Sequence, residues 1–215
     1  MANLKFLKRI GYSDINILEA NDSAFFYEAG MMIDADGAYH AYHPDNRSGL
    51  DYLGNAGRPG NWWALVTDNG QPSGNPVIQT ADDPAPGFYI STTSLEDTTR
   101  ERNDPRRNVN AEAIVLPGRL GLGAKLGDFA VVIRPYTGAY DYAVYADVGL
   151  ANKLGEGSIA LANALGIPFN PKNGGIGHGI AFIVFPGSAQ SWPLSQPDID
   201  CQQSIRSPLS APTGP

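Results

Sequence analysis

Residues 140–166 read YDYAVYADVGLANKLGEGSIALANALG and hold the clearest pattern in the chain. An apolar run predicts a strand that ends at Asp147, and a glycine-bounded loop leads from it to Glu156. The Ala- and Leu-rich run that follows predicts a short buried helix, because Ser158 is a good N-cap and Gly166 suits the position after the last turn. The pattern thus predicts that two carboxylates lie close together, one at the end of a strand and one before the start of a helix.

Other short apolar runs predict further strands, separated by turn residues. They are residues 23–34, 63–67, 87–92, 111–117, 128–135 and 180–185. Residues 1–20 mix basic and apolar side chains and are interpreted as an amphipathic lead-in without chemistry. The 25 glycines and 17 prolines agree with many short strands joined by turns. Strands at this spacing are typical of a β-barrel or β-sandwich.

Charge and length limit the class of protein. A chain of 215 residues favours one domain. Its net charge of -7 argues against nucleic acid and anionic membrane surfaces as partners, and favours a cationic ligand. No apolar run approaches the ~20 residues of a membrane span, and the N-terminal residues lack a stretch of signal-peptide length. Cys201 is the single cysteine, so no intrachain disulfide forms, and we expect it to be inert.

The carboxylates of Asp147 and Glu156 are the main catalytic candidates. Regular alternation along the strand places Asp147 on the same face as Ala143 and Tyr145, at the end that opens onto the loop. Glu156 lies two residues before the helix cap, near the positive end of the helix. A pair held at a fixed separation suits an inverting glycosidase, which needs room for a water molecule between its two carboxyl groups. Two surface acids beside a loop are the alternative that spacing alone leaves open.

Aromatic and acidic residues are concentrated in the loops that follow residue 34. Tyrosines and tryptophans on loops, such as Trp62, suit a sugar-binding cleft, because a sugar ring stacks its apolar face on an aromatic ring. The alternative is that these rings fill the core between short strands. Asp34, Asp36 and Asp51 are candidates for the subsites that bind a cationic ligand.

Several other motifs do not match a known site. His40 and His43 lie on a predicted loop, and His178 is remote in sequence, so we expect no metal site. The sequence DADG resembles the start of a calcium loop but lacks the later ligands. The glycines of residues 118–127 precede no helix, which argues against a nucleotide loop, and Ser158 lacks the surroundings of a nucleophilic serine.

Five segments resemble the chitosanases of glycoside hydrolase family 75. They are GDFAVVIRP, YAVYADVG, KLGEGSIALANALGI, DADGAYHAYHP and GLDYLGNAGRPGNWW, and they are spread so that the resemblance extends over most of residues 30–186. The resemblance implies endo-hydrolysis of the β-1,4 bonds of chitosan with inversion, and it places the catalytic pair at Asp147 and Glu156. The central stretch is also similar to double-psi β-barrel proteins, which include peptidoglycan-cleaving enzymes and non-catalytic cell-wall binders.

From these observations we expect a mainly β protein with a double-psi β-barrel-like core, one short buried helix and long loops. Residues 1–187 form the catalytic domain and residues 188–215 a Pro- and Ser-rich tail. Asp36, Asp51 and Trp62 are expected to bind a polycationic glycan. We also expect an extracellular monomer that needs no cofactor. Open alternatives are a peptidoglycan glycan-strand hydrolase and a non-catalytic glycan-binding barrel, and the sequence does not decide which carboxylate is the acid.

Overall fold

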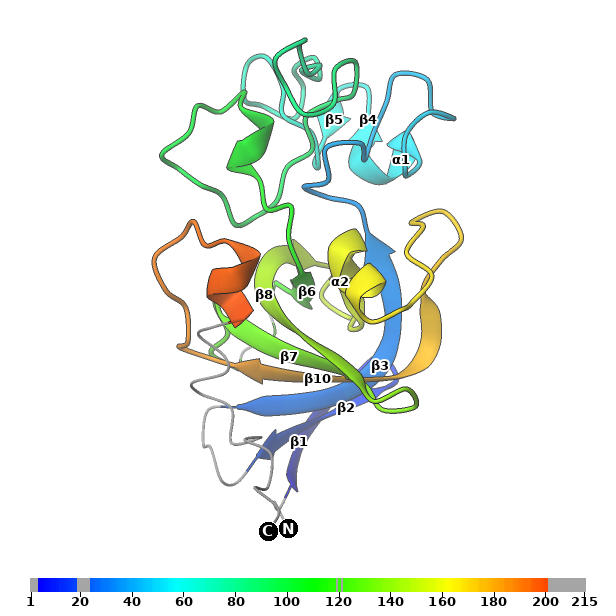
Figure 1. Cartoon of the computed structure of the whole chain (residues 1–215), viewed down its shortest axis with the longest axis vertical. Coiled ribbons are helices and arrows are strands. Elements are labelled where there is room, and N and C mark those ends of the chain that lie inside the picture. Colours follow the sequence, from blue (N-terminus) through cyan, green and yellow to red (C-terminus); the bar gives the residue numbers. More distant parts are fainter. Residues whose placement is uncertain (1–3, 19–23, 119, 121, 201–215) are drawn as a thin grey trace.

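The computed structural model describes residues 4–18, 24–118, 120 and 122–200, so that Cys201 lies outside the described residues. Within the described part of the chain, six strands form a closed barrel. In spatial order they are β3 (Phe25–Asp34), β10 (Ile176–Phe185), β7 (Phe129–Arg134), β8 (Ala139–Gly149), β6 (Ala113–Pro117) and β9 (Glu156–Ser158). A parallel pairing between β9 and β3 closes the circle (Figure 1).

Alternation along the strands fills the inside of the barrel. The odd-numbered residues of β3, such as Tyr27 and Met31, face inward and join Phe182 of β10 and Leu161 in one apolar cluster. The even-numbered residues Glu28 and Met32 are exposed on the outside. The predicted mainly β fold with a barrel core is therefore confirmed, whereas its double-psi topology stays a prediction.

Strand β8 departs from regular alternation close to its end. Tyr145 lies opposite Ile114 of β6, but the next residue of β6, Val115, lies opposite Asp147, so Ala146 is an extra residue. A bulge of this kind reverses which face the following side chains occupy. Asp147 therefore shares a face with Val115, and the expectation that it lies on the face of Tyr145 is wrong.

The short buried helix is confirmed at its predicted place. Helix α2 (Ile159–Ala164) begins after Ser158, whose hydroxyl oxygen accepts a hydrogen bond from the Leu161 N–H at 3.1 Å. Gly166 follows the C-cap residue Leu165, and its φ of +64° is a left-handed conformation that glycine adopts without strain. Leu161 and Leu165 lie in the barrel core, which explains the apolar composition of the helix.

Residues 35–112 form a loop region that lies over one end of the barrel (Figure 1). It contains only short elements in the described residues: α1 (Leu53–Ala56), β4 (Gly57–Arg58), β5 (Asn61–Trp62) and the 3₁₀ helix η1 (Pro105–Arg107). The strands predicted at residues 63–67 and 87–92 are present only as isolated bridges, such as Leu65 with Ser91. A second apolar cluster, which includes Tyr42 and Trp62, holds this region together.

The N-terminal segment is a β-hairpin rather than the predicted amphipathic lead-in. Strands β1 (Leu4–Ile10) and β2 (Ser13–Leu18) pair with each other, and β2 continues the sheet beside β3. Ile15 of β2 is buried in the barrel core, whereas Arg9 of β1 is exposed and paired with Asp14.

Residues 188–200 pack against the barrel. The Ser188 hydroxyl oxygen accepts a hydrogen bond from the Phe129 N–H at 2.8 Å, and Asp128 accepts one from the Ala189 N–H at 2.8 Å. Ile199 is fully buried in an apolar cluster with Phe129. This part of the predicted tail thus contributes to the core, while the domain boundary at residue 187 stays a prediction. Among the described residues, no helix is long and apolar enough to cross a membrane.

Candidate active site

Asp147 and Glu156 lie on either side of one residue of β6. Val115 lies opposite Asp147 of β8 on one side and opposite Glu156 of β9 on the other. Directly opposed residues of neighbouring strands project from the same face of a sheet, so both carboxylates stand on the outer face of the barrel. The two carboxylates therefore lie near each other, and their positions are set by the strands that flank β6 and not by the loop alone.

The pairing also limits the distance between the two acids. Neighbouring strands lie about 4.8 Å apart, so two strand spacings separate the backbones of Asp147 and Glu156 by roughly 10 Å. Side chains that project from the same face can lean toward one another across that gap. Roughly 6.5–9.5 Å between carboxyl groups leaves room for a water molecule, whereas direct attack on a sugar requires about 5–5.5 Å.

The Asp147 carboxylate is largely withdrawn from water and hydrogen-bonded to the loop region. Its Oδ1 atom accepts hydrogen bonds from the Ser94 N–H at 3.2 Å, from the Ser94 hydroxyl and from the Val148 N–H at 2.7 Å. Burial raises the pKa of Asp147 above its ordinary value, although these hydrogen bonds act to lower it. A carboxyl group with a raised pKa is suited to donate a proton.

Glu156 is held in a different environment by a neighbouring cation. The Lys153 ammonium lies 3.1 Å from Glu156 Oε1, and both side chains are partly buried. Gly149 leaves space beside this carboxylate, because a Cβ atom there would lie 2.9 Å from Val115 Cγ1 and 3.6 Å from Glu156 Oε2. An ion-paired, charged carboxylate is suited to accept a proton.

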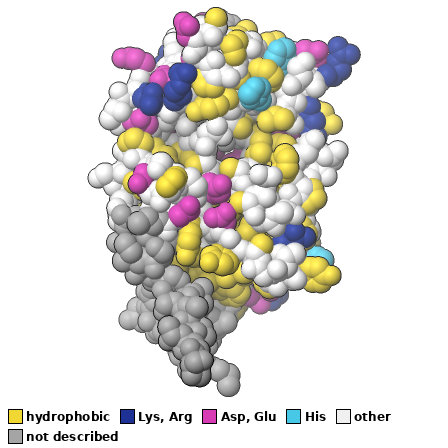
Figure 2. All heavy atoms as spheres, viewed as in Figure 1, with side chains coloured by type: hydrophobic (Ala, Val, Ile, Leu, Met, Phe, Trp, Pro, Cys, Tyr) yellow, Lys and Arg dark blue, Asp and Glu magenta, His cyan; other side chains and the backbone are white. Residues whose placement is uncertain are grey.

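Two more carboxyl groups, Asp34 and Asp36, lie next to this pair. Met32 of β3 lies opposite Glu156, and Asp34 follows two residues later on the same face. Burial, and then the charges of Asp147 and Glu156, raise the pKa of Asp34 to about 8, against an opposing hydrogen bond from the Asp36 N–H. Figure 2 shows acidic side chains gathered near the middle of one face, below the loop region.

Asp36 connects the acidic group to the loop region. Its Oδ1 atom accepts hydrogen bonds from the Tyr42 hydroxyl at 2.7 Å and from the Ser91 hydroxyl at 3.4 Å. Burial and the neighbouring charge of Asp34 raise the pKa of Asp36 well above its usual range. The charge of Asp34 thus disfavours ionisation of Asp36, and a bound cation would relieve that repulsion.

Ser158 holds β9, the strand that carries Glu156, through three hydrogen bonds. In addition to capping α2, its hydroxyl donates a hydrogen bond to the Ala111 carbonyl at 2.9 Å and accepts one from the Ala113 N–H at 3.0 Å. One hydroxyl therefore connects β9, the helix and the start of β6. Sequence reasoning found the cap but not the two cross-strand bonds, for which the sequence carries no signal.

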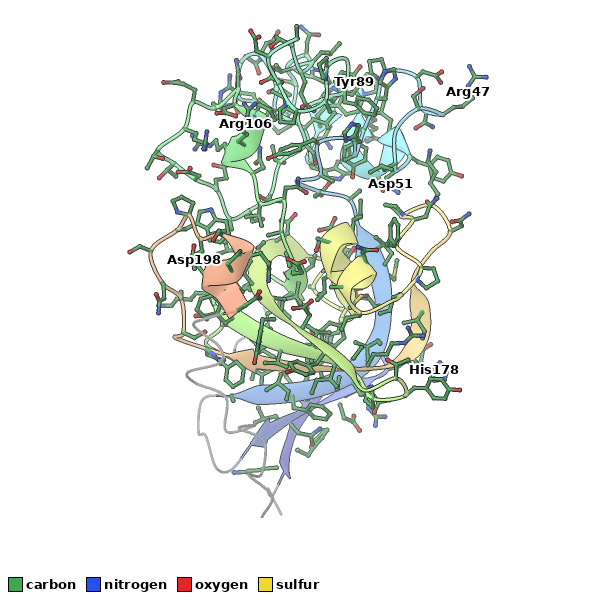
Figure 3. All side chains as sticks on the ribbon, viewed as in Figure 1. Arg47, Asp51, Tyr89, Arg106, His178 and Asp198 are labelled. Atoms are coloured by element: carbon green, nitrogen blue, oxygen red, sulfur yellow. The ribbon has the colours of Figure 1, made fainter. Side chains whose placement is uncertain are left out.

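The other two predicted binding residues, Asp51 and Trp62, are buried in the loop region. Asp51 is buried in the loop region, where its carboxylate accepts hydrogen bonds from the Asn55 amide at 2.9 and 3.0 Å (Figure 3). Trp62 is only 8% exposed and packs in the apolar cluster of that region. The neighbouring indole of Trp63 is the exposed one, and its N–H donates to the Asn55 carbonyl at 2.8 Å.

The three histidines do not come together. His40 and His43 pack edge-on against Phe88 in the loop region, whereas His178 lies beside the barrel (Figure 3). Across the described ranges, no three His, Cys, Asp or Glu side chains are arranged to hold a metal ion. The expectation that the protein works without a metal or cofactor stays a prediction.

Residues 109–207 match the family described as the fungal chitosanases of glycosyl hydrolase group 75. This segment is similar to the family 75 glycoside hydrolases. The match spans β6 to β10 and includes both Asp147 and Glu156, so it confirms the resemblance recognised in the sequence. The match to family 75 indicates a hydrolase that acts on glycosidic bonds, a chitosanase with a polysaccharide as its substrate.

The family 75 match begins after β3 and close to the end of the loop region, at residue 109. Asp34 and Asp36 therefore lie outside the matched residues, although the fold brings them to the same site. No curated protein matches the chain. Three contributors to the site were missed by sequence reasoning, namely Ser94, Lys153 and Tyr42. Only Lys153 carried a usable signal, since it is a basic residue three positions before the predicted catalytic glutamate.

Proposed function

We propose that the protein is an endo-acting chitosanase that cleaves β-1,4 bonds with inversion at the anomeric carbon. The observation that supports this most is the placement of Asp147 and Glu156 opposite the same residue, Val115. The separation of roughly 10 Å between their backbones suits a water molecule between one carboxylate and the sugar. The location of the site on an outer face of the barrel suits internal cleavage of a long chain.

Asp147 acts as the general acid in this proposal, and Glu156 as the general base. Asp147 gives its proton to the glycosidic oxygen as the bond to the anomeric carbon breaks. A water molecule on the opposite side of the ring adds to that carbon and gives its proton to Glu156. The raised pKa of the Asp147 carboxyl and the ion pair of Glu156 with Lys153 support this assignment of roles.

The acidic surroundings of the pair fit a polycationic substrate. Chitosan carries an ammonium group on each glucosamine unit, and such a group would pair with Asp34 or Asp36 as that carboxyl gives up its proton. Asp51 and Trp62 are proposed to assist binding indirectly, since both hold the loop that carries the exposed Trp63. The protein is proposed to act outside the cell as a monomer, where its polymeric substrate is accessible.

Proton NMR during the first minutes of chitosan digestion tests the function and the mechanism together. Inversion of a β bond predicts that the new reducing ends first appear as the α anomer and then equilibrate. A first product in the β form would contradict inversion, and the absence of new reducing ends would contradict the chitosanase activity itself.

Peptidoglycan is the alternative substrate to compare. Its glycan strands carry no free ammonium group on the sugar ring, so the buried carboxyls of Asp34 and Asp36 would lack a partner in it. Reducing ends released from purified cell wall, with none from chitosan, would favour the cell-wall reaction. Binding to either polymer without any turnover would favour a non-catalytic barrel.

A further inference from the structure

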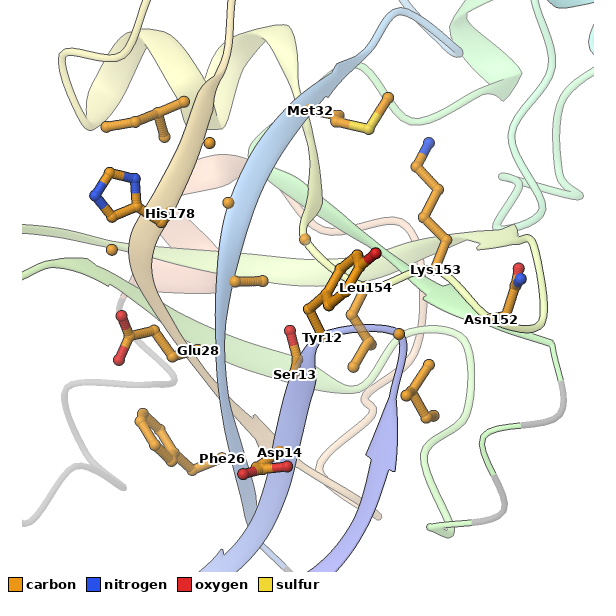
Figure 4. Close-up of a pocket in the computed structure, with 18 of the residues that line it drawn as sticks. Tyr12, Ser13, Asp14, Phe26, Glu28, Met32, Asn152, Lys153, Leu154 and His178 are labelled. Atoms are coloured by element: carbon orange, nitrogen blue, oxygen red, sulfur yellow. The ribbon is translucent and has the colours of Figure 1, made fainter.

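A large groove runs along the outside of β3 and leads toward the acidic pair. Its volume is about 1110 Å³, and its walls are the turn of the β1–β2 hairpin, residues 152–155 and residues 176–179 (Figure 4). Pockets for drug-sized ligands hold roughly 300–1,000 Å³, so this one has room for more than a single sugar. Nothing in the mechanism above uses it.

The groove and the catalytic face are continuous along one strand. Phe26, Glu28, Gly30 and Met32, in the outward-facing row of β3, line the groove, and the backbone of residues 176–177 packs directly against Gly30. That row is about 20 Å long, the length of several sugar rings. Met32 lies opposite Glu156, and Asp34 is the next residue of the same row. The same row of β3 therefore connects the groove to the catalytic carboxylates.

Lys153 contacts both the groove and the catalytic pair. It lines the groove, and its ammonium forms the 3.1 Å ion pair with Glu156. Figure 4 shows Lys153 and Tyr12 on one side of the β3 ribbon and Glu28 and His178 on the other. The groove thus ends at a residue that already belongs to the active site.

The charges that line the groove favour a cation. Asp14 is paired with Arg9 at 2.5 Å, and Lys153 is paired with Glu156. Glu28 is exposed, and no described residue forms an ion pair or a side-chain hydrogen bond with it. His178 is the remaining titratable side chain of the lining. Among the described residues, the carboxylate of Glu28 is therefore the negative charge of the groove that lacks an ion-pair partner. Tyr12 adds a fully exposed aromatic ring at the rim.

We propose that this groove binds the glucosamine units that extend from the cleavage point on the Glu156 side. Tyr12 packs against the apolar face of one sugar, and Glu28 pairs with the ammonium group of another. The inference rests on the proposed chitosanase function and adds to it the path of the polysaccharide along β3.

Glycines keep the groove open. Strands β10 and β3 lose their regular register between Ile176 and Ile180, so residues 177–179 have no ladder partners in β3. A Cβ atom at Gly177 would meet no other atom within 4 Å, and its φ is not in the left-handed region. A large side chain at Gly177 therefore fills the groove without displacing the core, which makes Gly177→Phe a suitable blocking substitution.

Calorimetric binding of a glucosamine hexasaccharide to the full chain tests the groove, in an Asp147→Asn background that prevents hydrolysis. We expect Gly177→Phe to weaken binding at least tenfold, and Tyr12→Ser and Glu28→Gln to weaken it several-fold each. Gly177→Ala, Tyr136→Ser and Glu101→Gln are matched controls at the same site or on exposed side chains elsewhere, and they should bind as the parent does. With an N-acetylglucosamine hexasaccharide, the effect of Glu28→Gln should disappear, because that ligand lacks the ammonium group.

Unchanged binding in folded Gly177→Phe would overturn the proposal, as would an equal loss in the controls. If Gly177→Phe does not fold, Tyr12→Ser and Glu28→Gln decide the question, because both replace exposed side chains. Turnover of chitosan by the unmodified protein is measured separately. Turnover with no effect of the groove variants on binding refutes the groove alone, whereas binding that depends on the groove without turnover refutes the chitosanase activity alone.

Discussion

Asp147 and Glu156 lie opposite the same residue, Val115, from the two strands that flank β6. The bulge in β8 is what makes this possible, since it moves Asp147 onto the outer face where Glu156 stands. Two acids nine positions apart in sequence thus acquire a separation set by strand spacing, which is a rigid property of the sheet.

Replacement of either carboxyl group tests the catalytic pair. Asp147→Asn and Glu156→Gln should each lower kcat on chitosan by about 10²–10⁴, the usual contribution of a positioned acid or base. Binding of a glucosamine oligosaccharide should persist in both, because Asp34 and Asp36 remain. Kinetics by reducing-end release, with Asp82→Asn as an exposed acid control, measures the effect, and full activity in either variant would remove that residue from the mechanism.

Ser94 should set the pH range of the reaction through Asp147. Its hydroxyl donates a hydrogen bond to the Asp147 carboxylate and so lowers the pKa of that group. In Ser94→Ala the pKa of Asp147 therefore rises, and the alkaline limb of the pH–activity profile should move to higher pH. Ser94→Thr should retain the original limb, and Ser73→Ala serves as a control in the same region. A profile that is unchanged in Ser94→Ala would contradict the assignment of Asp147 as the acid.

The sequence predicted the local features of the site because they depend on neighbouring residues. The helix cap at Ser158, the left-handed turn at Gly166 and the strand that leads to Asp147 follow from short patterns, and the structure confirms all three. The β1–β2 hairpin was missed because its mixture of basic and apolar side chains was interpreted as an amphipathic lead-in. The strands expected in residues 35–112 are present only as isolated β-bridges, because that region is held together by apolar packing and side-chain hydrogen bonds.

The parts that sequence could not supply depend on contacts between distant segments. The register of β8 against β6 decides the face of Asp147, and a single extra residue, Ala146, reverses it. The pairing of β3 with β9 brings Asp34 to Glu156, although 122 positions separate them in the chain. Exposure likewise separates Trp62 from Trp63, which are adjacent in sequence and differ only in which face of the loop they occupy.

Asp34 should reduce stability at neutral pH. Its pKa is raised to about 8 in the folded protein, above its value in the unfolded chain. The folded state then holds this proton more tightly, so the related stabilisation is complete below about pH 4 and is lost as the pH rises toward 8. Asp34→Asn should therefore raise the melting temperature at pH 7–8 by at least ~2–4 °C, equivalent to about 1 kcal/mol.

The gain from Asp34→Asn should shrink as the pH falls toward 4, where Asp34 is protonated in both states. Thermal unfolding from pH 4 to pH 8, with Asp82→Asn as an exposed control, measures this dependence. The same substitution should weaken binding of glucosamine oligosaccharides, because it removes a partner for the ammonium group. If Asp34→Asn melts at a lower temperature than the parent at pH 8, the Asp34 carboxylate stabilises the fold and the prediction is wrong.

Ser158 connects the stability of the fold to the position of the base. Removal of the helix cap costs about 1 kcal/mol, and Ser158→Ala also leaves the Ala113 N–H without its acceptor. We therefore expect a fall in melting temperature of at least ~2–4 °C. Because Glu156 is two residues away in the same strand, kcat should also fall, with little change in KM for chitosan. Ser158→Thr keeps the hydroxyl group and should recover both quantities, whereas a loss of stability with an unchanged kcat would limit the role of Ser158 to the helix cap.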